Sequence, residues 1–265
     1  MSGVRLPGGD IAWTGGQVIG ADGVAVHCVL APNASPMTLD GTNTWLIPSG
    51  GAALVIDPGP DDPAHHRAID QQLAALGVRA EAIVLTHAHP DHAAGAGACA
   101  NAWSVPVYAY ADLPAGASIH IPFGDTNIEV LATPGHTADS VCLFLPASRF
   151  LLTGDTVLGR GTSVVAWPDG DLGEYLDTLG RLADRVEDID VLLPGHGPVL
   201  TQPAAVLSAY RDHRARRLDE VKHALGSGAR TPGDVVAMVY ADVPKTLWPA
   251  AEQSVRAQLA YLGQL

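Results

Sequence analysis

Short apolar runs separated by polar or glycine-rich turns dominate the first two hundred residues. Nine of these runs have the length and composition of buried strands: 24–30, 43–47, 52–57, 82–86, 105–110, 127–133, 141–146, 150–154 and 190–195. The stretches between them predict helices over roughly 63–76, 92–102 and 171–186. Several predicted strands follow one another directly, as in hairpins. This order favours a mixed sheet, with two packed sheets flanked by helices, over a doubly wound parallel sheet.

The pattern changes near residue 200. A long helical pattern runs from Pro203 to the stop at Gly226, and its apolar face holds Leu207, Tyr210, Leu218, Val221 and Leu225. "TPGD" at 231–234 predicts a capped helix start, and a last helix is expected from about Pro249 to Leu262. We therefore predict two domains, a catalytic one over 1–202 and a small helical module over 203–265.

"THAHPDH", residues 86–92, places three histidines and one aspartate at a predicted strand-to-helix turn. Strand alternation sends His87 and His89 to the same side, while Asp91 and His92 follow around the bend and face a neighbouring point. The arrangement predicts two adjacent metal positions.

Three later turns each join an apolar strand, a glycine and one potential ligand. "ATPGHT" offers His136, "LLTGDT" offers Asp155 and "LLPGHG" offers His196. Glycine lets the backbone turn sharply, so that each ligand points over the edge of the sheet. Ligands drawn from four separate strand ends predict a site rather than a core.

Imidazole and carboxylate ligands without a thiolate suit zinc, with manganese or iron as alternatives. Two such ions about 3.5–4 Å apart share a hydroxide that attacks a carbonyl or phosphoryl centre. Asp91 and Asp155 are the carboxylates that this hydrolysis requires. Asp57, in "LVIDPG", is predicted to support the metal loops from a strand end. We interpret five other histidines as surface or structural residues: His27, His65, His66, His120 and His223.

Composition narrows the class of protein. The chain of 265 residues is 47% apolar and 16% charged, which is typical of one large domain, or one domain with an appendage, and a well-filled core. No apolar run approaches the length of about 18 residues that a membrane span needs, and no signal-peptide segment begins the sequence. The three widely spaced cysteines favour free thiols in a reducing cytoplasm.

The net charge of −13 argues at first against a nucleic-acid partner. The charge is unevenly distributed, however. Residues 1–200 carry 7 Lys/Arg against 22 Asp/Glu, whereas residues 201–265 carry 8 against 6. Cations bound by the ligand cluster offset part of the acidic charge. Charge therefore weakens the nucleic-acid hypothesis without removing it.

The order HxHxDH, His, Asp, His resembles the metallo-β-lactamase superfamily over residues from about 25 to 200. The resemblance implies a four-layer αββα sandwich with two divalent metal ions at one sheet edge. It assigns His87, His89 and His136 to the first metal, and it assigns Asp91, His92 and His196 to the second. By the same resemblance, Asp155 is expected to bridge the two ions, at the position where true β-lactamases of the family have a cysteine. That difference argues against antibiotic hydrolysis.

Three further segments are similar to one lactamase-like subfamily that includes mitochondrial endoribonucleases acting on single-stranded RNA. They are "LDGTNTWLI" (39–47), "DGDLGEYLDTLGRL" (169–182) and "YRDHRARRLDEV" (210–221). Members of this group end in a small winged-helix-like module, matched here by residues 226–265. Related proteins are thioesterases that act on acyl carriers. The substrate loop expected of glyoxalase II is absent after "TGDT".

Candidate substrate contacts lie in two of these segments and at two tryptophans. The arginines of "RDHRARR" can pair with phosphates: Arg211, Arg214, Arg216 and Arg217. Alternatively, these arginines lie on a solvated helix face and form ion pairs with Asp and Glu side chains. Thr42, Asn43 and Thr44 either contact substrate or hydrogen-bond the turn, and Trp167 and Trp248 either wall the cleft or pack in the core.

We predict a dinuclear metal-dependent hydrolase that cleaves phosphodiester bonds of single-stranded RNA with metal-bound hydroxide. A thioesterase that uses the same site is the alternative. A metal-binding regulatory protein without catalysis is the minor alternative. A homodimer is possible, and no membrane partner is expected.

Overall fold

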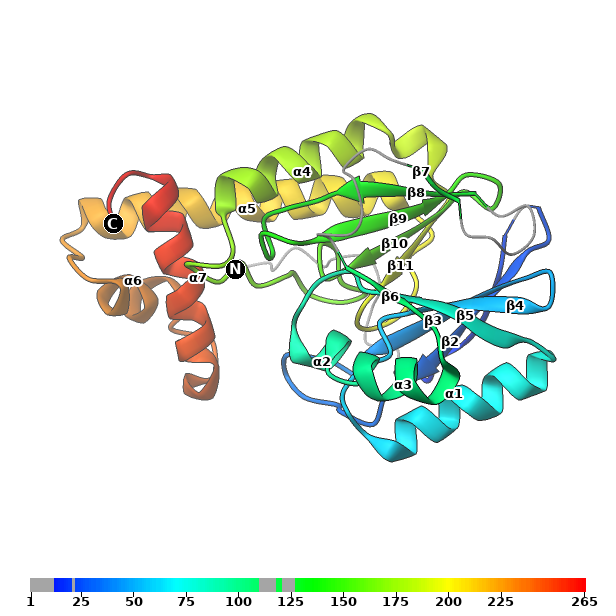
Figure 1. The fold of residues 1–265 in the computed structure, drawn as a ribbon. Coiled ribbons are helices and arrows are strands. Elements are labelled where there is room, and N and C mark those ends of the chain that lie inside the picture. The colour runs from blue at the N-terminus through cyan, green and yellow to red at the C-terminus, as the bar shows by residue number, and fades with distance from the viewer. Residues whose placement is uncertain (1–11, 21, 110–117, 121–126) are drawn as a thin grey trace.

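Two β-sheets pack face to face and helices cover their outer faces (Figure 1). This arrangement is seen in the computed structural model, which describes residues 12–20, 22–109, 118–120 and 127–265. It confirms the four-layer αββα sandwich that the resemblance implies. Among the described residues, no helix has both the length and the apolar character needed to cross a membrane.

The first sheet has the order β1-β2-β3-β4-β5-β6. Its strands are β1 Gly16–Ile19, β2 Ala25–Leu30, β3 Asn43–Ser49, β4 Ala52–Ile56, β5 Arg79–Val84 and β6 Val107–Tyr108. Strands β1 to β4 pair antiparallel, and β4, β5 and β6 pair parallel. The predicted strand 105–110 is thus shorter than expected, and its last residue lies outside the described residues.

The second sheet has the order β11-β10-β9-β8-β7. Its strands are β7 Ser118–His120, β8 Asn127–Ala132, β9 Val141–Leu145, β10 Phe150–Gly154 and β11 Val191–Pro194. Only the β10–β11 pair is parallel among these described strands. The predicted mixed sheets are confirmed. The edge strands β1 and β7 were not predicted; β1 is mostly exposed and lacks an apolar run.

Apolar side chains from both sheets form the central layer of the core. Trp45 and Ile56 of the first sheet meet Leu143 and Phe150 of the second, and all four are almost fully buried. These are the alternate positions of the apolar runs, which a pleated strand sends to one face. Burial of this layer fixes how the two sheets face each other, and with it the edge where their loops meet.

Helices α1 Pro63–Leu76 and α3 Ala96–Trp103 cover the first sheet, and α4 Leu172–Asp184 and α5 Pro203–Gly226 cover the second (Figure 1). Helix α1 has the predicted bounds, because the Asp62 side chain caps its first turn and Gly77 ends it with φ of 68°. Helix α4 begins at the Asp171 cap and is followed by the 3₁₀ turn Val186–Asp188.

The predicted helix 92–102 is wrong in one respect, because it is two helices. Helix α2 spans Pro90–Ala93 and α3 begins at Ala96. At the break, the Gly95 N–H donates to the Gly59 carbonyl at 2.9 Å, and a Cβ at Gly95 would lie 2.6 Å from His66 Nε2. This close backbone contact comes from a distant loop, so the local sequence pattern does not reveal it.

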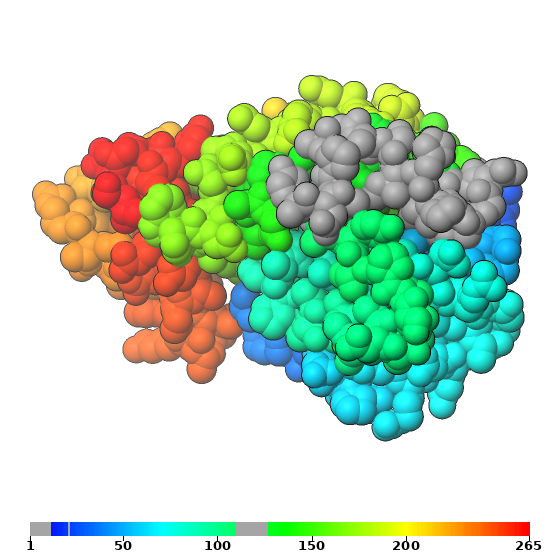
Figure 2. Space-filling model, in the orientation of Figure 1, coloured from blue at the N-terminus to red at the C-terminus, as the bar shows by residue number. Residues whose placement is uncertain are grey.

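The C-terminal module contains α6 Pro232–Val239, the 3₁₀ turn Lys245–Leu247 and α7 Trp248–Tyr261. The predicted helix start at "TPGD" is confirmed, since Thr231 and Asp234 form a capping box. The module, which we call the C-terminal lobe, lies at one side of the sandwich, which we call the body; the lobe is coloured orange to red in Figure 2. Helix α5 contributes to the apolar clusters of both the body and the lobe. The domain boundary at residue 202 therefore stays a prediction.

Candidate metal centre

All seven predicted ligands lie at one edge of the sandwich, each after the carboxyl end of a strand. His87 and His89 follow β5, and Asp91 and His92 lie in the short helix α2. The remaining three follow β8, β10 and β11, in the order His136, Asp155 and His196. The structure thus brings together four segments that are up to about a hundred residues apart in the sequence.

Asp57 fixes the orientation of two of the histidine rings. Its carboxylate accepts hydrogen bonds from the Thr86 N–H at 2.8 Å, from the Thr86 hydroxyl at 2.7 Å and from His92 Nδ1 at 2.8 Å. Since the Thr86 hydroxyl gives its proton to Asp57, it accepts one from His87 Nδ1 at 3.0 Å. His87 and His92 therefore each turn Nε2 toward the cluster. The predicted supporting role of Asp57 is confirmed by these contacts.

Backbone carbonyls orient two further rings in the same way. His136 Nδ1 donates to the Val164 carbonyl at 2.7 Å, and His196 Nδ1 donates to the Gly41 carbonyl at 3.1 Å. Their Nε2 atoms also face inward. His89 instead turns Nδ1 inward, where it lies 3.0 Å from His87 Nε2 and 3.1 Å from His136 Nε2.

The donor set fits divalent cations. His92 Nε2 and His196 Nε2 lie 3.2 Å apart, and both Nδ1 protons are already used elsewhere. Two ring nitrogens that both carry a lone pair, or that both carry a proton, repel each other at this distance, and a shared cation removes the repulsion. In addition, the buried oxygen Asp155 Oδ1 has no hydrogen-bond partner among the described residues. A cluster of this kind is compatible with bound metal ions.

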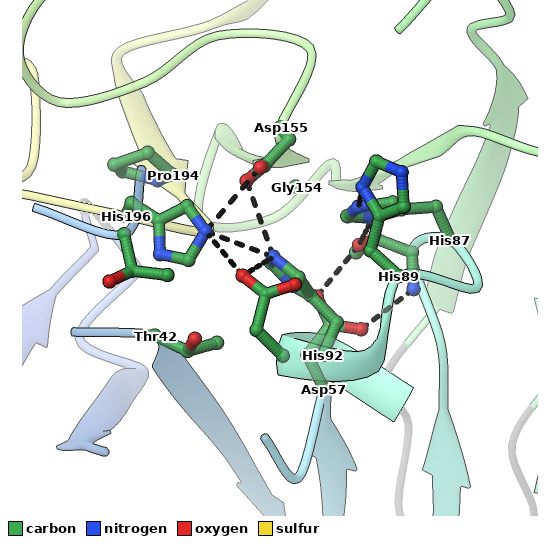
Figure 3. A network of polar contacts seen from close by, with 12 residues as sticks. Thr42, Asp57, His87, His89, His92, Gly154, Asp155, Pro194 and His196 are labelled. Carbon is green, nitrogen blue, oxygen red and sulfur yellow. Dashed lines mark hydrogen bonds and ion pairs between the residues drawn. The ribbon is translucent and has the colours of Figure 1, made fainter. Parts of the chain in front are cut away.

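Asp155 lies between the two predicted ligand sets (Figure 3). One group of converging atoms contains His87, His89 and His136, and another contains Asp91, His92 and His196. Asp155 is 3.8 Å from His136 Nε2, which belongs to the first group, and 3.4 Å from both His92 Nε2 and His196 Nε2, which belong to the second. This is the position a bridging carboxylate needs, although the identity and number of the ions stay predictions.

Burial and charge act on these groups in opposite directions. Burial is the largest influence on the pKa of His87 and of His136, and it lowers both. Burial also opposes charge on Asp155, but His196 and His92 outweigh it and hold the pKa of Asp155 well below its usual range. In the same way Asp155 overcomes burial at His196 and raises the pKa of that ring to about 9. Without metal, the buried Asp155 carboxylate is therefore balanced by protonated histidine, whose charge a bound cation would replace.

Three predicted substrate contacts are instead internal. The side chains of Thr42, Asn43 and Thr44 are fully buried. Asn43 donates to the Pro194 and Gly197 carbonyls, which holds β3 against the His196 turn. Thr44 donates to the Asp57 carbonyl, and Thr42 bonds to Asn33. The prediction that these residues contact substrate is therefore wrong, because their polar groups are used in the turns.

The predicted arginine cluster is dispersed over helix α5. Arg214 is buried, donates to the Ser163 carbonyl and lies 4.8 Å from the Tyr175 ring centre. Arg217 pairs with Glu220 at 2.7 Å and stacks on Tyr240. Arg211 and Arg216 are exposed. A direct phosphate contact from Arg214 is thus wrong, since its guanidinium group is enclosed in the protein.

Trp167 and Trp248 are partly buried and pack against different apolar clusters. Trp167 lies before α4, and its backbone N–H donates to the Gln253 carbonyl at 3.4 Å, whereas Trp248 belongs to the C-terminal lobe. The residues that sequence reasoning missed are those behind the cluster, including Thr86, Ser163 and Tyr210. Only Thr86 carried a signal, since it begins "THAH".

Comparisons with known proteins agree with this geometry. Residues 37–115 and 119–196 match the Metallo-beta-lactamase superfamily, and residues 231–264 match the Beta-lactamase associated winged helix domain. A Beta-lactamase-like protein 2 homolog from Caenorhabditis elegans is 32% identical over 253 residues, covering 90% of this chain and 84% of the relative. An Atrochrysone carboxyl ACP thioesterase from Aspergillus chevalieri is 34% identical over 232 residues, covering 82% and 73%.

Among solved structures, a Beta-lactamase domain protein from Burkholderia ambifaria superposes with a TM-score of 0.80. The match covers 98% of this chain and 91% of that one at 21% identity, so it shows the fold alone. The sequence match, the sandwich and the seven converging ligand candidates lead to one conclusion. The chain belongs to the metallo-β-lactamase superfamily, and it is a hydrolase of that fold with the associated winged-helix domain.

Proposed function

We propose that this chain is a dinuclear, metal-dependent hydrolase of acyl thioesters, with zinc as the expected metal. The observation that carries the metal centre is the convergence of five imidazole rings, each of which turns one ring nitrogen into a cluster that also contains the carboxylates of Asp91 and Asp155. When bound, the cations lower the pKa of a water molecule and polarise a carbonyl oxygen.

The chain's own side chains divide the remaining work. His87, His89 and His136 would hold one ion, and Asp91, His92 and His196 the other, with Asp155 shared. Asp91 is 30% exposed, whereas Asp155 is only 11% exposed. Asp91 is therefore the carboxylate placed to orient an incoming water and to take up its proton.

Charge at the edge supports a thioester over a phosphodiester. The exposed carboxylate of Asp169 lies 4.0 Å from His89 Nε2, and Arg160 pairs with Asp40 at 2.6 Å. Two arginines predicted to bind phosphate already have partners in the protein: Arg214 donates to the buried Ser163 carbonyl, and Arg217 pairs with Glu220 at the surface. An anionic backbone meets repulsion from Asp169, while an uncharged carbonyl does not. The relative named as an acyl-carrier thioesterase supports the same substrate class.

Single-stranded RNA is the second candidate substrate. Arg211 and Arg216 are exposed on α5, and the winged-helix match lies directly after this helix. Exposed arginines can neutralise phosphates at some distance from the metal centre, and each neutralised phosphate makes binding more sensitive to salt. The RNA hypothesis therefore depends on these two side chains.

The test is a substrate panel run on one preparation. Protein loaded with zinc or with manganese is assayed against an acyl thioester, a single-stranded RNA and a β-lactam, after its bound metal has been measured. We expect metal-dependent thioester hydrolysis that chelator abolishes. Two bound ions per chain with no activity on any substrate would favour the regulatory alternative.

The matched variant is the double change Arg211→Gln and Arg216→Gln. Thioester hydrolysis should be unchanged, because both side chains lie outside the ligand cluster. If RNA is the substrate instead, RNA affinity should fall and its salt dependence should flatten by about two phosphate contacts. RNA cleavage that exceeds thioester hydrolysis and responds in this way would overturn the thioester proposal.

A further inference from the structure

Residues 155–164, which we call the Asp155 loop, touch three of the ligand candidates. The loop carries Asp155 itself, and its Val164 carbonyl orients His136 by accepting from Nδ1 at 2.7 Å. The Gly159 N–H donates to the His196 carbonyl at 2.8 Å. A Cβ at Gly159 would lie 2.3 Å from the Pro198 carbonyl oxygen, so the loop and the His196 turn are in close backbone contact. The position of this loop therefore sets the geometry of three ligands.

The Asp155 loop contains no helix or strand, so side chains behind it must satisfy its backbone groups. Within the loop, the Ser163 hydroxyl lies against the Asp155 and Thr156 carbonyls. From α4, the Tyr175 hydroxyl donates to the Thr156 carbonyl at 2.6 Å. Two further supports come from α5.

Tyr210 and Arg214 lie four residues apart on α5, and hence on the same face of that helix. The Tyr210 hydroxyl accepts from the Leu158 N–H at 2.8 Å and lies 3.3 Å from the Leu158 carbonyl, to which it can donate. Arg214 donates to the Ser163 carbonyl. Both side chains thus hold the loop through its backbone groups.

Packing alone does not account for Arg214. Its side chain is 5% exposed, and it forms no ion pair with a carboxylate among the described residues. Burying an arginine without such a partner costs more than burying an apolar side chain of similar length. The guanidinium group instead donates a hydrogen bond to the carbonyl of Ser163, whose hydroxyl contacts the Asp155 carbonyl.

We propose that Tyr210 and Arg214 are positioning residues of the metal centre, acting through the Asp155 loop. The proposal rests on the metal centre described above but not on the thioester substrate. Helix α5 would then both support the metal loops and pack in the C-terminal lobe. The same helix buries Val221 and Ala224 in the C-terminal lobe, so the lobe is joined to the metal loops by one continuous element.

The test compares metal affinity in variants that keep the shape of the helix. Tyr210→Phe removes only the hydroxyl, and Arg214→Met removes the donors while keeping the length. Leu218→Ala is the matched control, because it lies one turn further on α5 and offers no polar group to the loop. Zinc affinity is measured by competition with a chelator of known affinity, and each variant is also melted.

We expect Tyr210→Phe and Arg214→Met to lower the zinc affinity of the more weakly binding position by about 10-fold or more, because loss of a supporting hydrogen bond has an effect of this size at metal sites. Arg214→Lys should recover part of this loss. The control should lower stability and leave zinc affinity unchanged. Wild-type affinity in both loop variants would overturn the proposal, as would an equal loss of affinity in the control. A wild-type protein that binds no zinc would instead overturn the metal centre itself.

Discussion

The metal cluster and the C-terminal lobe are held together in opposite ways. In the cluster, irregular loops are fixed by hydrogen bonds to buried polar groups such as Asp57 and Asn43. In the lobe, regular helices are fixed by apolar side chains such as Val221, Val255 and Leu259. The first region gathers buried ionisable groups whose charges must be balanced by protons or by cations, whereas the second gains most of its stability from apolar burial. The two regions should therefore respond to different perturbations.

Two residues near the metal cluster have positive backbone φ angles. Asp57 has φ of 51°, a region that costs a residue with a side chain about 1–3 kcal/mol and occurs at functional sites. Gly154 has φ of 47°, and a Cβ there would lie 2.6 Å from Thr86 Oγ1. The surrounding hydrogen bonds hold both residues in place. The turns at this edge are thus shaped by the ligand cluster rather than by local preference.

The largest expected effect is the loss of hydrolysis in Asp155→Ala. This change removes the carboxylate between the two ligand groups, which contributes several kcal/mol to transition-state stabilisation. Activity on the true substrate should fall by about 1000-fold. Circular dichroism should show that the fold and the C-terminal lobe survive. Near-normal turnover in this variant would contradict the dinuclear assignment.

Removal of metal should produce the largest change in stability. A cation present at about 1,000 times its dissociation constant adds about 4 kcal/mol to folding, because the unfolded chain cannot assemble the site. Chelation should therefore lower the melting temperature markedly, and added zinc or manganese should restore it. The apoprotein should stay folded, since its apolar clusters do not depend on metal. Identical melts with and without chelator would show that no metal site exists.

Leu259→Ala tests the opposite region. Leu259 is 3% exposed in the apolar cluster of the lobe, and truncation of such a leucine costs about 2–5 kcal/mol. Denaturant unfolding should show this loss, while zinc affinity should stay at the wild-type value. A parallel loss of zinc affinity would mean that the lobe and the cluster are a single cooperative unit.

The smallest expected effect is a loss of folding stability at low pH that comes from His65. Burial, followed by repulsion from His66, lowers the pKa of His65 to about 4, and the ring bonds to the Thr44 hydroxyl at 2.8 Å. Its ordinary pKa is about 6.5, so between these values the unfolded chain binds more protons. Stability should therefore fall as the pH drops below 6.5, by about 2 kcal/mol at pH 5.

The check is a denaturant series on the metal-loaded wild type and on His65→Gln at pH 7 and at pH 5. The variant has no titrating ring at this position, so it should lose about 2 kcal/mol less between the two pH values. Equal losses in both proteins would show that His65 is not the group responsible.

Prediction from the sequence succeeded where the signals were local. Helix α1 has its predicted bounds because the Asp62 cap, Pro63 and Gly77 are neighbours in the chain. The start of α6 at Thr231 follows from a capping box within four residues. Prediction failed at β1, because its residues form no apolar run and its hydrogen bonds come from pairing with β2. It also failed at the break between α2 and α3, where Gly95 bonds to the distant Gly59. Such contacts are set by tertiary packing and leave no periodic pattern.

The sequence by itself determined the types and the order of the seven ligand candidates, because each stands next to the strand or glycine turn that presents it. Only the tertiary structure decided which ring nitrogen each histidine turns inward. His196, for example, is oriented by Gly41, 155 residues away in the chain. The tertiary structure likewise decided that Arg214, which was predicted to contact phosphate, donates a hydrogen bond to the Asp155 loop instead. A helix pattern tells which residues share a face, but the neighbouring element decides what that face meets.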